Sequence, residues 1–119
     1  MDCAQKALPA SVRCENCVMK QMAYCHLGSA SRWQELDALL KRQKGRCAYT
    51  GVKILPGINA SIDHIHPRSL YPERARDVKN MRFVDRRVNQ AKNNMTLPQF
   101  VRMCKSVLLH AGYEIERPE

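Results

Sequence analysis

The chain has 119 residues, of which 45% are hydrophobic and 26% charged; these values exclude a wholly disordered chain and fit one small domain. No apolar run is long enough to cross a membrane, and the first residues lack the pattern of a secretory leader. We therefore expect an intracellular, cytoplasmic protein that does not bind membranes. Charge is the unusual property, because 20 Lys and Arg stand against 11 Asp and Glu, giving +9 and an isoelectric point near 9.6. This balance predicts a polyanionic partner, most often nucleic acid.

The positive charge is concentrated in the middle of the chain. Residues 46–95 carry ten basic and four acidic side chains, whereas residues 96–119 carry three of each. A well-solvated surface would also explain the excess. The nucleic-acid interpretation is favoured because the same segment holds the chemically reactive residues described below.

Residues 1–28 are predicted to form a Cys-rich module that ends at Gly28. A tetrahedral site of four thiolates is the usual structural zinc arrangement, and the segment offers one CxxC pair flanked by two more cysteines. His26 can replace the last of these ligands. A single CxxC pair is a weak signal, and the alternative is a helical segment with buried free thiols. The candidate structural Zn²⁺ ligands are Cys3, Cys14, Cys17 and Cys25.

The next segment predicts a helix with one buried face. Ser31 and Gln34 fit a capping box, and Gly45 fits a C-terminal cap. Residues 46–65 follow, with β-branched and aromatic residues interrupted by Thr-Gly and Pro-Gly, which predicts short strands joined by turns. The apolar face of the helix consists of Trp33, Leu36, Leu39 and Leu40.

The second half predicts a loop, a strand and two helices. Residues 66–77 read as the loop and 81–84 as the strand, and Asp85 is placed to cap a helix over 85–95. Thr96 with Gln99 forms a second capping box, which begins a helix closed by Gly112. We expect this last helix to pack against the core through one continuous apolar face, which consists of Leu97, Phe100, Val101, Cys104, Val107, Leu108 and Ala111.

Four polar residues lie at the junctions of these elements. Asp63 and His64 end a predicted strand, Asn80 precedes the next strand, and Asn89 lies on the helix after it. Since each element is too short to bury its apolar face alone, they should fold together and bring Asp63 towards Asn89. Carboxylate and amide oxygens suit Mg²⁺ and leave room for water and a phosphate. Neighbouring side chains of a strand point to opposite sides, so His64 stays free to act as a base.

The runs CAYTG, ASIDHIHPRS and DVKNMRFVDRRVNQAKNNMTLPQF occur in this order. Together they resemble the HNH, or ββα-metal (His-Me finger), endonuclease family over roughly residues 31–110. The resemblance implies an α+β fold in which a small ββα-metal nuclease core is flanked by helices, here behind the Cys-rich N-terminal module. The expected division is a module over 1–28, an HNH endonuclease domain over 29–112 and a C-terminal tail over 113–119.

The resemblance also implies a role for each motif residue. His64 matches the general base that activates the attacking water. Asp63 and Asn89 match two ligands of a single Mg²⁺ or Mn²⁺ ion. Asn80 matches the residue that orders the loop and supports the orientation of the base. Many relatives carry His at the last position, and Asn89 is an accepted variant that keeps an oxygen ligand.

One motif departs from the zinc-bearing relatives of this family. They carry CxxC where this chain has CAYTG, so Thr50 stands in place of the second Cys, and a later CxxC is also missing, with Asp85 at its place. We therefore expect no zinc within the nuclease motif. Cys47 is instead predicted to be a small core residue.

The expected function is that of a metal-dependent DNA endonuclease or nickase of HNH type, which hydrolyses phosphodiester bonds. RNA is a further substrate class, and a homodimer or a targeting partner would add the recognition surface that so short a chain lacks. The family occurs in bacterial and phage settings. Two other interpretations stay open, a non-catalytic zinc-containing nucleic-acid-binding module and a structural adaptor with core histidines. The candidate nucleic-acid contacts are Arg68, Lys79, Arg82, Arg86, Arg87 and Lys92.

Overall fold

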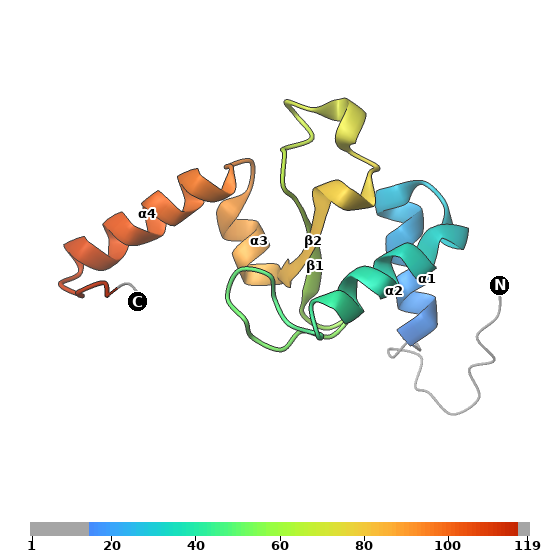
Figure 1. Cartoon of the computed structure of the whole chain (residues 1–119), viewed down its shortest axis with the longest axis horizontal. Coiled ribbons are helices and arrows are strands. Elements are labelled where there is room, and N and C mark those ends of the chain that lie inside the picture. The colour runs from blue at the N-terminus through green and yellow to red at the C-terminus, as the bar shows by residue number, and fades with distance from the viewer. Residues whose placement is uncertain (1–14, 117–119) are drawn as a thin grey trace.

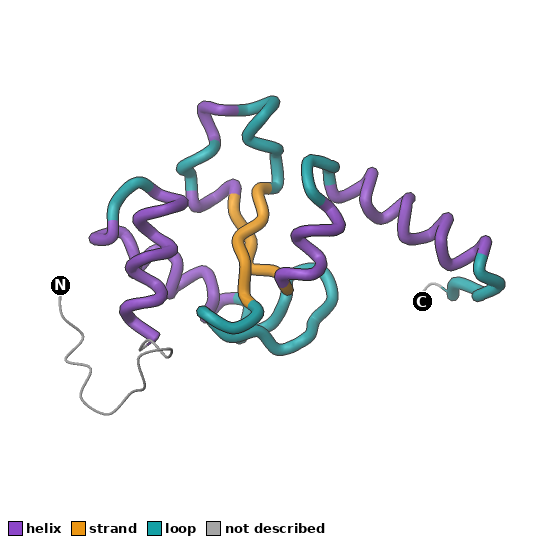
Figure 2. Tube along the Cα trace, turned by 180° about the vertical axis from the view of Figure 1, so that it is seen from behind, coloured by secondary structure: helices purple, strands orange, loops and turns teal. Residues whose placement is uncertain are grey.

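The computed structural model describes residues 15–116, which form an α+β fold of helices around a two-stranded antiparallel sheet (Figure 1). In both views the strands lie between a pair of helices, α1 and α2, and a third, α3, while α4 extends away from the rest (Figure 2). Within residues 15–116, no helix combines the length and apolar character that crossing a bilayer requires. The elements are α1 (Glu15–Leu27), α2 (Trp33–Arg42), β1 (Ala60–His64), β2 (Met81–Asp85), α3 (Arg86–Lys92) and α4 (Leu97–His110), with 3₁₀ turns at Ala30–Arg32, Pro72–Arg74 and Val78–Asn80.

One hydrophobic core joins α1, α2 and the sheet. Helix α1 contributes Met19, Ala23 and Leu27, which are four residues apart and therefore lie on one face. The predicted boundary at residue 28 is thus wrong for the described part of the N-terminal module, because residues 15–27 share their core with the rest of the fold. The remaining members of the core are Leu36, Leu39, Leu40, Cys47, Ile54, Ala60, Ile62, Met81, Phe83 and Val84.

Helix α2 has the predicted buried face, but it begins differently. Ser29, and not Ser31, accepts a hydrogen bond through its side chain, from the backbone N of Ser31 (3.3 Å), and so caps a 3₁₀ turn that leads into α2 at Trp33. At the other end Gly45 donates its backbone N–H to the carbonyl of Leu40 (3.1 Å), the bond that closes a helix C-terminus. The predicted C-terminal cap is therefore confirmed and the predicted N-terminal cap is wrong.

Residues 46–59 form a loop instead of the predicted short strands. The strand pattern holds only at β1, and the loop before it keeps one isolated bridge, between Arg46 and Lys53. Turns at Gly51 and Gly57, both with positive φ, reverse the chain too often for a ladder to extend. Cys47 is buried, which confirms it as a core residue.

Asp85 is both the last residue of β2 and the N-cap of α3, so it links the sheet to this helix. Ala60 pairs with Asp85 and His64 with Met81 at the two ends of the ladder. The Asp85 side chain then accepts a hydrogen bond from the backbone N of Arg87 (2.9 Å), as predicted for a helix cap. Because the chain turns back at this cap, α3 runs alongside β1 in the same direction. The helix ends at Lys92, three residues earlier than predicted.

The side chain of Gln43 completes the outer edge of β2. Its Nε2 donates to the carbonyl of Phe83 (2.8 Å), and its Oε1 accepts from the backbone N of the same residue (2.9 Å). A two-stranded sheet leaves such edge groups without a ladder partner, and a buried unpaired group is costly. The backbone N of Ala48 donates to the same carbonyl (3.0 Å), so Gln43 and Ala48 together take the place of a third strand at Phe83.

The predicted capping box of α4 is confirmed, but the predicted packing of this helix against the core is wrong. Both hydrogen bonds of the Thr96 and Gln99 capping box are formed. No residue of α4 is buried, however, and Val107, in the middle of the predicted face, is 61% exposed. Amphipathic spacing defines an apolar face without specifying what covers it, and the short link after α3 directs this helix away from the core (Figure 1).

We expect Leu36→Ala to lower the free energy of unfolding by about 2–5 kcal/mol, because Leu36 is fully buried between the helices and the sheet. Val107→Ala is the matched control and should change it by less than about 0.5 kcal/mol. Urea unfolding followed by circular dichroism measures both. An equal loss at Val107 would show that the face of α4 is covered.

Candidate active site

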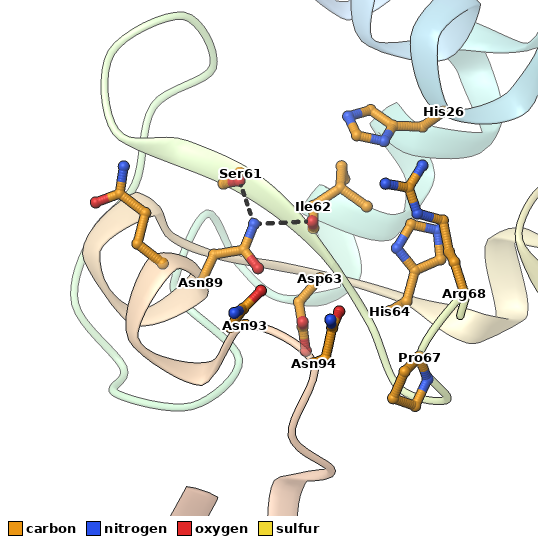
Figure 3. Close-up of a pocket in the computed structure, with 11 residues that line it drawn as sticks. His26, Ser61, Ile62, Asp63, His64, Pro67, Arg68, Asn89, Asn93 and Asn94 are labelled. Carbon is orange, nitrogen blue, oxygen red and sulfur yellow. Dashed lines mark hydrogen bonds between the residues drawn. The ribbon is translucent and has the colours of Figure 1, made fainter. Parts of the chain in front are cut away.

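Helix α3 places two polar side chains beside β1. Asn89 Nδ2 donates to Ser61 Oγ (2.6 Å) and to the carbonyl of Ile62 (3.1 Å), as Figure 3 shows. One turn further along, Lys92 Nζ donates to Asp63 Oδ1 (3.2 Å). Three helical residues rise about 4.5 Å and one strand residue about 3.3 Å, so a step of one turn on α3 matches a step of one to two residues on β1.

Asp63, His64 and Asn89 line one cavity of about 310 Å³ between β1, α3 and the end of α1. They come from segments up to 26 residues apart, and their convergence is what the sequence predicted. Arg68, from the loop after β1, and His26, from the last turn of α1, line the same cavity (Figure 3). The cavity therefore combines oxygen donors on one side with imidazole and guanidinium groups on the other.

His64 is held in one tautomer by the loop between the strands. Its Nε2 lies 2.9 Å from the carbonyl oxygen of Ala75, and since a carbonyl only accepts, Nε2 carries the hydrogen. Burial lowers the pKa of His64, and the hydrogen bond to Ala75 opposes this shift without cancelling it. The ring is therefore neutral at pH 7 and keeps a lone pair on Nδ1, which a general base requires.

Asn80 is buried and fastens both ends of that loop. Its Oδ1 accepts from the backbone N of His66 (2.8 Å), and its Nδ2 donates to the carbonyls of His66 (3.1 Å) and Arg74 (3.2 Å). The residue after Arg74 is Ala75, whose carbonyl orients His64. Asn80 thus holds the loop next to the carbonyl that binds His64, and its predicted role in orienting the base stays a prediction.

Asp63 forms the most buried polar contact of the site. Lys92 is 1% exposed, and its Nζ lies 3.0 Å from Asp63 Oδ2. The Tyr49 hydroxyl donates to the same oxygen (2.6 Å), and burial together with this carboxylate raises the pKa of Tyr49, so the hydroxyl stays a donor. The prediction that Lys92 contacts a phosphate is wrong here, because its ammonium group is turned inwards onto Asp63.

The donor set fits a hard divalent ion. Asn89 uses its amide hydrogens on β1, which leaves Oδ1 on the side where Figure 3 shows Asp63. An ionised carboxylate has about four acceptor positions, and the contacts with Tyr49 and Lys92 do not use all of them. Within residues 15–116 no three His, Cys, Asp or Glu side chains gather as a metal site, so one carboxylate and one amide would be the protein ligands. Mg²⁺ takes such incomplete oxygen shells and keeps its waters.

The remaining predicted residues are dispersed. Of the predicted nucleic-acid contacts, only Arg68 lines the cavity. Arg86 and Arg87 are exposed at the far end of the strands, where Arg87 pairs with Asp85 (3.3 Å). Lys79 is exposed and Arg82 half-buried.

The predicted zinc site is described only in part. Cys3 and Cys14 lie outside the described residues. Cys25 has an exposed free thiol, whereas Cys17, half-buried in α1, is disulfide-bonded. A disulfide sulfur is not a thiolate, so Cys17 does not act as a zinc ligand in this structure, and zinc at the other cysteines stays a prediction.

Two residues of the site were missed in the sequence. Tyr49 lies in a loop that was predicted as a strand, and nothing in its spacing points to Asp63. The sequence points to His26 only as a zinc ligand, because no pattern in it indicates that α1 reaches His64. In the structure their ring centroids are 6.4 Å apart.

The end of α1 is joined to the loop that holds His64. Arg32 Nη1 donates to the carbonyls of Leu27 (3.2 Å) and Arg76 (3.4 Å), and the same guanidinium pairs with Glu35 (2.6 Å). Gly28 has φ +84°, and a Cβ there would lie 2.5 Å from Arg76 Nη1. Only glycine allows so close an approach at this position without a shift of the Arg76 side chain.

Comparison with known proteins assigns no family. No protein-family model matches the chain, and no curated protein matches it at a significant level. The function is therefore argued from the geometry of the cavity.

Lys92→Met should destabilise the protein by about 3–5 kcal/mol, because it leaves the carboxylate of Asp63 buried without its cation. The double variant Asp63→Asn/Lys92→Met should recover much of the loss. Lys41→Met, at an exposed pair with Asp37, is the matched control and should cost less than about 1 kcal/mol. Thermal and urea unfolding measure all three, and equal effects at Lys41 and Lys92 would contradict the burial of the pair.

Proposed function

We propose that this protein is a metal-dependent endonuclease of HNH type in which β1, β2 and α3 form the ββα-metal core. The observation that carries the proposal is a neutral histidine, His64, whose Nδ1 is unused, in one cavity with two oxygen donors, Asp63 and Asn89. A base beside a cation site is the arrangement that phosphodiester hydrolysis needs. The net charge of +9 supports a nucleic-acid substrate, with DNA as the first candidate and RNA as the second.

The mechanism assigns a task to each side chain. His64 Nδ1 accepts a proton from the attacking water, and Ala75 keeps the ring oriented throughout. Asp63 and Asn89 would hold the divalent ion, which would supply charge stabilisation for the transition state and for the departing 3′ oxygen. Water adds to phosphorus as the bond to the 3′ oxygen breaks, and this oxygen takes up a proton from solvent, which leaves a 5′-phosphate and a 3′-hydroxyl end. Arg68 neutralises a phosphate at the cavity rim.

A second candidate is a nucleic-acid-binding module without catalysis. The buried pair of Asp63 and Lys92 favours it, because Lys92 already neutralises the carboxylate that an ion would need. The two candidates differ in whether cleavage occurs when Mg²⁺ or Mn²⁺ is added.

His64→Ala should reduce cleavage about 10²–10⁴-fold while leaving nucleic-acid binding unchanged, because only proton transfer is lost. Plasmid nicking in Mn²⁺ measures the first effect, and fluorescence anisotropy in EDTA measures the second. His110→Ala, at an exposed position on α4, is the matched control. Full activity of His64→Ala would remove the assigned base, and absence of cleavage by the wild type under all metal conditions would favour the second candidate.

Asn89→Ala should raise the Mn²⁺ concentration needed for half-maximal cleavage, since it removes one oxygen ligand, whereas Asn89→Asp should not raise it. Calorimetric titration of the protein with Mn²⁺ tests the same point without cleavage. Asn94→Ala, at the exposed rim of the cavity, is the control. An unchanged metal requirement in Asn89→Ala would show that Asn89 only fastens α3 to β1.

A further inference from the structure

The inference concerns His26, which the proposed mechanism does not use. It lies in the last turn of α1, outside β1, β2 and α3, and it lines the same cavity as His64. The planes of the two rings are inclined by 47°. Figure 3 shows both rings together with the Arg68 guanidinium, which lies between them.

The ring of His26 has no structural hydrogen bond to explain it. In the described part of the chain, Nδ1 is buried and has no partner. A buried polar atom without a partner costs about 1–3 kcal/mol, so an apolar side chain would stabilise this position better. A histidine that costs stability at the wall of a cavity points to a ligand that uses its other nitrogen.

In the described part of the chain, the groups that act electrostatically on His26 are His64 and Arg68, and neither is acidic. Burial lowers the pKa of His26, and the neighbouring His64 and Arg68 lower it further, so the ring is neutral. Among residues 15–116 Arg68 has no ion pair within 4.0 Å, and Asp63, the acidic residue that lines the cavity, is paired with Lys92. The group that would complete this corner is an anion that accepts hydrogen bonds.

We propose that His26 binds a phosphodiester oxygen of the substrate by donating a hydrogen bond from Nε2, beside Arg68, which supplies the charge. This rests on the proposed function and extends it, because it makes α1 part of the substrate site. A neutral imidazole carries one N–H, and with Nδ1 enclosed the hydrogen on Nε2 is the one that a ligand in the cavity can reach. His26 then fixes the position of the phosphate that His64 and its water attack.

The test uses the full chain with His26→Leu, His26→Gln and the control His110→Leu. Leu fills the space without a polar atom, whereas the Gln amide nitrogen can replace Nε2. We expect His26→Leu to keep or raise the melting temperature and to weaken binding of a labelled DNA duplex in EDTA by about tenfold or more. His26→Gln should bind within about threefold of wild type.

Salt dependence separates this contact from the charge of Arg68. Because His26 is neutral, His26→Leu should leave the slope of binding against salt concentration unchanged. Arg68→Gln should reduce the slope by about one phosphate contact. In Mn²⁺, His26→Leu should raise KM more than it lowers kcat.

Three results would decide against the inference. Wild-type binding and KM in His26→Leu would show that His26 is only part of the cavity wall. Equal losses of kcat in the Leu and Gln variants with unchanged KM would show proton transfer instead of binding. A lower melting temperature in His26→Leu with no specific effect on binding would show a structural role.

The proposed function can fail separately. A wild-type protein that binds DNA without cleaving it, while His26→Leu weakens that binding, would overturn the nuclease and support the phosphate contact. Cleavage by the wild type, with no change in binding or KM in His26→Leu, would support the nuclease and overturn the phosphate contact.

Discussion

The buried ion pair between Asp63 and Lys92 is the contact on which the site depends. It joins the C-terminal end of β1 to the last residue of α3, and both charged groups are buried away from water. Taking two ions out of water costs several kcal/mol each, and the pair compensates only if its geometry is kept. Tyr49 adds a second donor to the carboxylate. The pair therefore fixes how far α3 slides along β1, and with it the place of Asn89.

The electrostatics of the cavity follow from this pair. With Asp63 paired to Lys92, no acidic residue between positions 15 and 116 forms an ion pair with Arg68. Burial lowers the pKa of both nearby imidazoles, which keeps them uncharged. In the described part of the chain, the cavity thus presents two uncharged imidazoles and the guanidinium group of Arg68. The proposed phosphodiester substrate would suit this combination, because it brings its own negative charge.

The sequence allowed prediction of local features and of their order along the chain. Asp85 and Thr96 cap helices as expected, because a cap depends on residues two or three positions away. The α+β class and the convergence of Asp63 with Asn89 followed from short elements that must share a core. The inward turn of Lys92, the reach of α1 to His64 and the exposure of α4 could not be predicted, since each depends on packing between segments far apart in the chain.

The contact of Gln43 with Phe83 limits how small a part of this protein could be moved to another scaffold. Residues 60–92 carry the proposed base and both proposed oxygen ligands, yet Phe83 in their outer strand relies on an amide from the end of α2. A graft of that segment alone would expose an unpaired strand edge and would also lose the hydroxyl of Tyr49. The smallest transferable unit therefore begins no later than the end of α2, and a designer would have to carry over much more than residues 60–92 to obtain one small pocket.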